Sequence, residues 1–456
     1  MTTQLTTGKP VAEDASAAAG PPAAGTTSCR LGAACPPFPG NALVPVTVQL
    51  PELAEGLRYT ARQPILDLHG RMHGYELLFR SGPEEAFRGD GDLATRTMLD
   101  NTVIFGLDKL TGGLPAFVNC TADALTGRLV HVLPSSMTVL EILENLEPTK
   151  TLIDACRALK ASGFRLALDD FTWAPEFEPL VALANYVKVD FILTRPEERK
   201  VLVARLRSYA VALIAEKIET QKEYKQACAE GFTLFQGFYF CRPELLENHK
   251  VPVNRLSYLE ILQLLRSESI DLRKLTRLVK RDAALTYRLL RLVNSPLSAV
   301  RQEIRSVHAA LLAVGEDCFR RIATLAITSE LNTGQPTEVL RMSFVRGRFC
   351  ELAAGLCGLD PTEQYLLGML SLLPAMLRVR MEELAPGLAL REEIRNALLG
   401  TDTPERVLLN WMENQERGDW AACDALAEAN RLDAQPLVHC YAAAVLWAED
   451  TLHFAV

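Results

Sequence analysis

Acidic and amide side chains recur at the ends of short apolar runs in the first half of this chain. Glu76 lies in GYELLFR, Asn119 follows AFV, Glu141 lies in VLEILE, and Asp169 and Asp170 follow RLAL. Carboxylate and amide oxygens are hard ligands that suit Mg²⁺, Mn²⁺ or Ca²⁺ rather than zinc. Two such ions could activate a water molecule and neutralise a phosphodiester during in-line displacement.

Further polar residues close later runs. Lys188 and Asp190 lie in YVKVD, Glu216 and Glu219 lie in IAEKIE, and Gln236 follows TLF. A lysine among these acids could steady an attacking water or the charge of a phosphate.

Simpler interpretations stay open for single residues. A glutamate at one strand end is ordinarily solvated or ion-paired, and Asp169 and Asp170 could cap the next helix. Lys188 and Asp190 could pair across a loop. The whole set favours a shared site, because its members fall one after another on the same predicted rim.

The elements that must position this set alternate along the chain from Arg58 to about Arg242. Short apolar runs alternate with helical stretches such as Leu93–Gly106 and Leu152–Ala161, which predicts a parallel sheet with crossover helices. About eight units suggest a closed barrel, whose active site gathers at the carboxyl ends of the strands. Because the segment is shorter than the ~250 residues typical of that barrel, some helices must be short or missing. The runs are Pro64–Leu68, Gly74–Phe79, Ala116–Val118, Thr138–Ile142, Arg165–Leu168, Tyr186–Val189, Val211–Ala215 and Leu234–Phe235.

Two other segments differ from the barrel. Residues 1–45 are rich in Ala, Gly, Pro and Thr, and we expect a disordered tail. From about Val253 to the end, apolar residues recur at helical spacing, as at Leu285, Leu289 and Leu292. Breakers at Ser295-Pro296 and Gly334–Pro336 divide the predicted helices.

Composition limits the classes of function. The chain has 456 residues, which predicts two or three domains. Its net charge of −8 argues against broad nucleic-acid binding but not against a local pocket for a small anion. The 11 cysteines are dispersed without a CxxC pair, which is typical of a reducing compartment. We find neither a signal peptide nor an apolar run of ~18 residues, so we expect a cytoplasmic protein without a membrane span.

The ordered motifs RQPI, GYELLFR, FVN, LEILE, LALDDF, VKVD, IAEKIE and FQGFYFCRPE resemble the EAL domain family over residues 58–245. The resemblance implies a TIM-type α/β barrel that binds cyclic di-GMP. Active members hydrolyse this dinucleotide to pGpG with Mg²⁺ or Mn²⁺. The opening RQPI…GYELLFR further resembles the subgroup fused to HDOD domains.

The resemblance implies roles position by position. Lys188 matches the lysine near the reacting phosphate, Glu216 the proposed general base, and Glu219 a supporting carboxylate. Positions that contact ligand or water correspond to Gln63, Arg80 and Gln236. The implied metal ligands are Glu76, Asn119, Glu141 and Asp169, with Asp170 at a second metal.

The chain departs from the family pattern beside these residues. Leu77 replaces the alanine of the Glu-Ala-Leu signature, and Thr172-Trp173-Ala174 replaces a glycine-bearing loop after Asp170. Glycine permits positive φ in such a loop. The family motif AEGVE reads AEKIE here, and Lys217 stands in place of its glycine. Catalysis is sensitive to misplacement by ~1 Å, whereas ligand binding tolerates more.

The later run KRDAALTYRLLRLVNSPL, Lys280–Leu297, resembles the HDOD family, and the similarity covers about residues 253–450. The resemblance implies an all-α domain, assigned here to 253–456, related to metal-dependent HD phosphohydrolases. None of the seven His precedes an Asp, and Gly368–Leu372 reads GMLSL where an HD enzyme reads GLLHD. We therefore expect a protein-interaction output module without hydrolase chemistry.

Three other features of this half have plain interpretations. We expect Asn294 to cap a helix or join a polar network, and His308 to be packed or on the surface. The basic stretch Arg273–Arg291 reads as a solvated helix face, with a partner surface as the sharper alternative.

The leading hypothesis is a bacterial signalling protein in which the barrel controls the helical domain through cyclic di-GMP. We favour a barrel that is a receptor or regulatory scaffold. The first alternative is an active metal-dependent phosphodiesterase, because the acids are all present. The second is a pure interaction scaffold that binds no nucleotide. A protein partner is expected at the HDOD domain, and a homodimer stays open.

Overall fold

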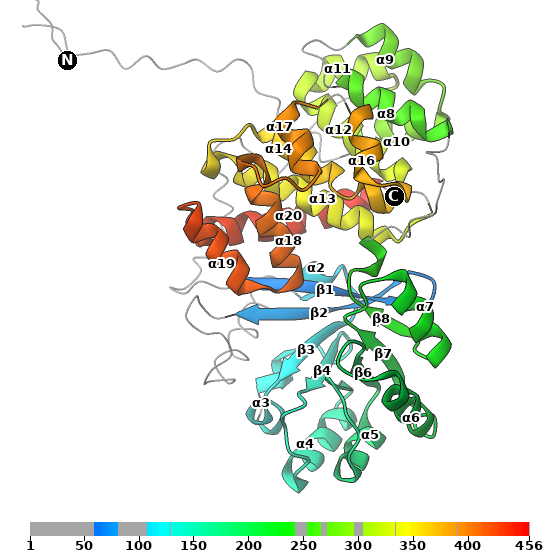
Figure 1. Cartoon of the computed structure of the whole chain (residues 1–456), viewed down its shortest axis with the longest axis vertical. Helices are drawn as coiled ribbons and strands as arrows, with labels where there is room; N and C mark the ends of the chain where they lie inside the picture. The colour runs from blue at the N-terminus through cyan, green and yellow to red at the C-terminus, as the bar shows by residue number, and fades with distance from the viewer. Residues whose placement is uncertain are drawn as a thin grey trace, which may run out of the picture. The chain divides into compact units, whose positions relative to one another are not determined.

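The computed structural model describes residues 59–80, 107–127, 129–241, 253–265, 271–295, 304–332, 334–388 and 390–455 (Figure 1). The predicted tail at 1–45 and the predicted helix Leu93–Gly106 lie outside the described residues. No helix in these ranges is both long enough and apolar enough to span a membrane.

Eight strands close a barrel in chain order, which confirms the predicted architecture (Figure 1). Helix α4, Lys150–Ala161, confirms the predicted stretch Leu152–Ala161. The strands are β1 Tyr59–Asp67, β2 Met72–Arg80, β3 Ala116–Cys120, β4 Thr138–Ile142, β5 Arg165–Leu168, β6 Tyr186–Asp190, β7 Ala212–Glu216 and β8 Leu234–Gln236. The other barrel helices are α2 Leu107–Thr111, α3 Ala122–Thr126, α5 Glu178–Leu183, α6 Pro196–Leu206 and α7 Gln221–Glu230.

The prediction of an all-parallel sheet is wrong at β1, which runs antiparallel to both β2 and β8. A tight turn joins β1 to β2, and Asp67 Oδ1 accepts the backbone N–H groups of His69 (2.8 Å) and Arg71 (2.9 Å). A parallel crossover needs a dozen or more residues, and this connection is far shorter. One crossover helix is thereby absent, which helps the barrel close within fewer residues than usual.

Side chains alternate between the barrel interior and its outer surface, because successive residues of a strand point to opposite faces. A separate apolar cluster inside the barrel takes one residue from most strands. On most strands, a polar residue lies two positions along from the residue of this cluster. These polar residues all lie toward the same end of the barrel. The apolar cluster comprises Ile65, Phe117, Val139, Ala167, Tyr186, Ile214 and Leu234.

The second half is helical throughout its described part, as predicted. Helix α13, Thr337–Ala353, packs against α14, Pro361–Leu370, and α20, Ala434–Ala455. The predicted breaker at Gly334–Pro336 lies between α12 and α13. The other helices are α8 Val253–Leu265, α9 Leu272–Val279, α10 Ala283–Val293, α11 Val307–Val314, α12 Glu316–Leu331, α15 Leu373–Leu377, α16 Met381–Leu384, α17 Glu392–Leu398, α18 Val407–Arg417 and α19 Trp420–Ala429.

Polar contacts join β1 and β2 to the helical half. Arg62 donates to Glu449 Oε1 (2.8 Å), and it also donates to the Leu110 carbonyl of the barrel helix α2 (2.7 Å). Tyr75 donates to Glu338 Oε2 (2.7 Å). These contacts lie on the part of the barrel wall where no crossover helix connects the strands.

Candidate functional site

The polar residues at one end of the barrel interior converge on the ammonium group of Lys188. Its Nζ lies 2.8 Å from Glu141, 2.8 Å from Asp169, 2.9 Å from Glu216 and 3.1 Å from Glu76. Lys188 is 1% exposed and Glu141 is fully buried. The structure therefore brings together four of the predicted carboxylates around one cation that belongs to the chain. We call these five residues the inner cluster.

Amide side chains extend the inner cluster toward β1, β3 and β8. Asn119 Nδ2 donates to Glu76 Oε1 (3.0 Å), and Gln236 Nε2 donates to Glu76 Oε2 (2.6 Å). Gln236 Nε2 also donates to Gln63 Oε1 (2.9 Å). Gln63, Glu76 and Gln236 thus form one hydrogen-bonded row, which links three of the predicted ligand-contacting or metal-binding positions.

Burial and crowding of like charges shift the titration of the inner cluster. Burial raises the pKa of Glu216 to about 8 and raises the pKa of Asp169. Burial and the neighbouring Glu76 charge raise the pKa of Glu141 well above its ordinary value. Burial also opposes ionisation of Glu76, but Lys188 and the amide donors outweigh it, and its pKa is lowered. Burial disfavours the charge of Lys188, yet the surrounding carboxylates raise its pKa well above the usual range.

Asp170 lies in a second group, outside the inner cluster's contacts with Lys188. Its Oδ2 is 3.6 Å from Lys217 Nζ, and the same ammonium lies 2.5 Å from Asp190 Oδ2. We call Asp170, Asp190 and Lys217 the outer cluster. The alternative that Lys188 and Asp190 pair with each other is wrong, because each has other ion-pair partners.

The alternative that the paired aspartates cap the next helix is also wrong. That helical segment begins at Pro175, and its N-cap position is Ala174. Asp169 instead continues the strand direction, with its backbone N–H bonded to the Ile142 carbonyl of β4 (3.0 Å).

Two predicted site residues are not placed in either cluster. Glu219 is half-buried beyond β7, and its backbone N–H donates to Glu223 Oε2 (2.9 Å). Arg80 ends β2, and its side chain lies outside the described residues. Their predicted roles stay predictions.

A hard divalent cation suits the inner cluster by donor chemistry and by charge. Asn119 Oδ1 and Glu141 Oε2 are buried oxygens without a hydrogen-bond partner among the described residues. Buried acceptors of this kind ordinarily have partners. When all four carboxyls are ionised, Lys188 alone cannot balance their charge. As the side chains stand, however, no group of three or more His, Cys, Asp or Glu residues in the described part is arranged to hold a metal ion.

In the helical half, an arginine contacts the position where an HD enzyme has its His-Asp pair. Ser371 Oγ accepts from Arg346 Nη1 (3.1 Å) and donates to the Gly368 carbonyl (2.7 Å). Arg346 is buried and forms a two-pronged ion pair with Glu416 (2.9 and 2.6 Å). This polar group serves packing between α13, α14 and α18, because all of its donors and acceptors face one another.

The other features predicted for this half are structural. Asn294 holds both backbone groups of Ile304, accepting from its N–H (2.7 Å) and donating to its carbonyl (2.8 Å). His308 is exposed, as expected for a surface position. Along the basic stretch, Arg273 and Lys280 are exposed, whereas Arg288 pairs with Glu330 (2.8 Å).

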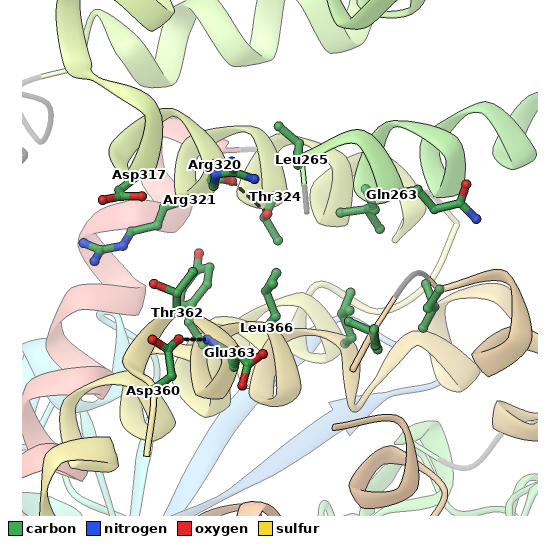
Figure 2. Close-up of a pocket in the computed structure, with 15 residues that line it drawn as sticks. Gln263, Leu265, Asp317, Arg320, Arg321, Thr324, Asp360, Thr362, Glu363 and Leu366 are labelled. Atoms are coloured by element: carbon green, nitrogen blue, oxygen red, sulfur yellow. Dashed lines mark hydrogen bonds between the residues drawn. The ribbon is translucent and has the colours of Figure 1, made fainter. Parts of the chain in front are cut away.

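Sequence reasoning missed a cavity of about 230 Å³ in the helical half. Figure 2 shows Asp317, Arg320 and Arg321 of α12 facing Glu363 of α14 and its N-cap residue Asp360 across this cavity. Its charged groups already have structural uses, since Arg321 pairs with Glu351 (2.9 Å) and Asp360 caps α14. Most of the wall is apolar and is formed by Leu262, Leu265, Leu366, Leu370, Leu388 and Leu390.

Comparison with known proteins gives two domain matches and two full-length relatives. The EAL domain model matches residues 119–243 and the HDOD domain model matches residues 251–408. The chain is 33% identical to YuxH of Bacillus subtilis over 405 residues, covering 86% of this chain and 98% of YuxH. It is 32% identical to the cyclic di-GMP phosphodiesterase CdgJ of Vibrio cholerae over 399 residues, covering 86% of this chain and 92% of CdgJ.

Among solved structures, the barrel region is similar to Klebsiella pneumoniae BlrP1 in complex with calcium and cyclic di-GMP. The identity is 24% and the TM-score is 0.34, over 40% of this chain and 54% of that structure.

Proposed function

Because the chain belongs to the family of proteins in which an EAL domain precedes an HDOD domain, we propose that its barrel is a cyclic di-GMP receptor that controls the helical domain. The relative CdgJ, which shares both halves, bears the name of a cyclic di-GMP phosphodiesterase. The helical domain would then pass the signal to a protein partner.

The side chain of Gln63 carries this proposal. Its Oε1 accepts from Gln236 in the row that ends at Glu76, and its Nε2 donates to the Arg417 carbonyl at the end of α18 (3.1 Å). The same amide therefore touches the candidate ligand site and the helical half. A nucleotide that takes hydrogen bonds from Gln63 must compete with α18 for it. Binding at the barrel and release of α18 are thereby coupled in free energy.

The inner cluster is acidic, so recognition of an anionic dinucleotide there would depend on a bound cation. A bound Mg²⁺ or Mn²⁺ would supply positive charge for the phosphate groups. Glu76, Asn119, Glu141 and Asp169 are the residues that would hold it, and all four have oxygen donors that suit such an ion. Lys188 balances part of their charge when no cation is present.

The loop after Asp170 favours a receptor over a hydrolase. Thr172-Trp173-Ala174 stands where the family has a glycine-bearing loop, and glycine is the residue that permits positive φ there. Catalysis is sensitive to misplacement of its groups by ~1 Å, whereas ligand binding tolerates more. In the cation-free chain, burial raises the pKa of Glu216 to about 8, and its carboxyl lies 2.9 Å from the Lys188 ammonium.

Active hydrolysis to pGpG is the second candidate. It is favoured by the complete set of acids from Glu76 to Glu219 and by the relative CdgJ, whose name is that of a cyclic di-GMP phosphodiesterase.

Calorimetric titration of the full chain with cyclic di-GMP in Mn²⁺, followed by chromatography of the same samples, separates the candidates. We expect binding that weakens more than tenfold in Glu76→Gln, with no pGpG. Glu147→Gln changes an exposed carboxyl beyond β4 and serves as the matched control. Product that disappears in Glu76→Gln would establish the phosphodiesterase and contradict the receptor. Absence of both binding and product would leave the pure interaction scaffold. Light scattering on these samples reports whether the chain forms a homodimer.

A further inference from the structure

Two non-glycine residues next to the inner cluster have left-handed backbone conformations. Asp170 has φ 39° and Lys217 has φ 56°, and both lie just beyond the carboxyl ends of their strands, β5 and β7. Residues that carry a Cβ rarely adopt this backbone conformation, because it brings the Cβ too close to the backbone. Backbone strain of this kind concentrates at functional sites. Only two other non-glycine residues in the described ranges share it, Arg378 and Arg431. The strain therefore marks one small region of the barrel rim.

The side chains of the two strained residues meet across the end of β6. Lys217 Nζ lies 2.5 Å from Asp190 Oδ2 and 3.6 Å from Asp170 Oδ2. The other oxygen of Asp190 accepts the backbone N–H groups of Ile192 (2.7 Å) and Leu193 (2.8 Å). Asp190 is thus fully engaged and is 5% exposed. The left-handed backbone of Lys217 accompanies the placement of its ammonium between two carboxylates.

The two clusters differ in the number of carboxyl groups and of unpartnered oxygens that are available to an added cation. In the inner cluster, one lysine faces four carboxyl groups, and Glu141 Oε2 and the adjoining Asn119 Oδ1 are buried without hydrogen-bond partners among the described residues. In the outer cluster, one lysine faces two carboxylates, and within the same described part only Asp170 Oδ1 is buried without a partner. A divalent ion bound by Asp170 and Asp190 would lie within a few ångströms of the Lys217 ammonium. Repulsion between these like charges is strong at such distances.

We propose that Lys217 is a built-in cation of the outer cluster, so that the barrel holds one divalent cation rather than two. The inference rests on the proposed function in one respect, because the single cation belongs to the inner cluster. It adds that the outer side of the ligand site presents an ammonium group of the chain. The outer residues therefore do not fit a second metal ion.

Counting bound Mn²⁺ on the full chain without nucleotide tests this assignment. Free Mn²⁺ is followed by its electron paramagnetic resonance signal during titration. We expect one Mn²⁺ per chain for the native sequence and for Lys217→Arg, which keeps the charge. We expect two for Lys217→Gly, which removes both the charge and the strained side chain. Lys217→Gln removes the charge and keeps a side chain, and should also gain a second, weaker ion.

Two results would overturn the proposal. One is a native chain that binds two Mn²⁺ or none. The other is a count of one in both Lys217→Gly and Lys217→Gln, with circular dichroism showing that these variants are folded. The count is independent of the nucleotide, so a chain that binds one Mn²⁺ but no cyclic di-GMP would contradict the proposed function and leave the role of Lys217 standing.

Discussion

Lys188 sets the charge balance of the candidate site. It is almost fully buried and lies within 3.1 Å of four carboxylates, which have little other access to positive charge. Buried charges are tolerated when they are paired, and removal of one partner leaves the others uncompensated. The cation-free chain therefore depends on this single side chain.

Replacement of Lys188 by Met should destabilise the cation-free chain by about 3–5 kcal/mol, the usual cost of breaking a buried ion pair. Urea unfolding in a chelator measures this loss. Added Mn²⁺ should restore part of it, because a ligand of the folded state stabilises that state. Lys200→Met changes an exposed lysine of α6 and should stay within about 0.5 kcal/mol of the native chain. Equal stability of the two variants would contradict this role.

Glu216 makes the stability of the barrel dependent on pH. Its pKa rises from 4.5 to about 8 on burial, so the folded chain keeps a proton that the unfolded chain loses between these values. Because the unfolded state binds fewer protons, the free energy of unfolding falls as pH increases from about 4.5 to 8. The slope for one proton is about 1.4 kcal/mol per pH unit. Glu141 and Asp169 also have raised pKa values and contribute in the same direction, so Glu216→Gln should lessen, but not abolish, the slope measured by urea unfolding in a chelator. An unchanged slope would show that Glu216 is not the group responsible.

The sequence predicted which acids share the site better than it predicted how they are arranged. Glu76, Glu141 and Asp169 converge because each has an inward-facing position in or just after its strand. The alternation of inward and outward residues that places them there is visible in the sequence. The central position of Lys188 depends on barrel closure, which brings β2, β4 and β6 to one axis. The pairing of Lys217 with Asp190 had a local signal, since Asp190 ends β6 and Lys217 follows the neighbouring strand β7. The sequence does not show the left-handed turn.

At the scale of elements, the end of β8 is constrained by close backbone packing. Gly237 has φ 136°, and a Cβ there would lie 2.2 Å from the Ile218 carbonyl oxygen. Ile218 donates its N–H to the Gln236 carbonyl (2.9 Å) and accepts from the Tyr239 N–H (3.1 Å), which holds the segment after Gln236 against the segment after Glu216. Two site residues are thus positioned by one glycine.

Gly237→Ala should cost about 2–5 kcal/mol, combining left-handed strain of about 1–2 kcal/mol with overpacking of about 1–3 kcal/mol. Gly334→Ala is the matched control, because Gly334 has φ 84° but nothing within 4 Å of an added Cβ. It should show the strain alone. Thermal and urea unfolding compare the two variants. A smaller loss for Gly237→Ala than for Gly334→Ala would refute the packing argument.

The sequence contains a signal for the β1–β2 hairpin, but the prediction of a parallel sheet did not take it into account. The apolar runs at Pro64–Leu68 and Gly74–Phe79 are separated by too few residues for a crossover helix. That distance alone indicates an antiparallel pair. The general β–α alternation of the later strands led to the parallel prediction for all eight.

At the scale of the whole molecule, the two halves are joined through β1. Arg62 pairs with Glu449, which also accepts from Arg341 Nε (2.9 Å), and Gln63 bonds the end of α18. These adjacent residues of β1 point to opposite faces of the strand, so one strand serves the helical half and the candidate site together. The Arg62–Glu449 pair spans 387 positions in sequence, a separation at which composition and periodicity carry no signal.

The most direct test of the coupling is hydrogen–deuterium exchange of the full chain with and without cyclic di-GMP, in Mn²⁺. We predict faster exchange in α18, Val407–Arg417, when the nucleotide binds, because Gln63 then leaves the Arg417 carbonyl. Gln63→Ala should show the same increase without nucleotide. If the nucleotide protects β1 and β2 while exchange in α18 stays unchanged, the barrel does not control the helical domain through this contact.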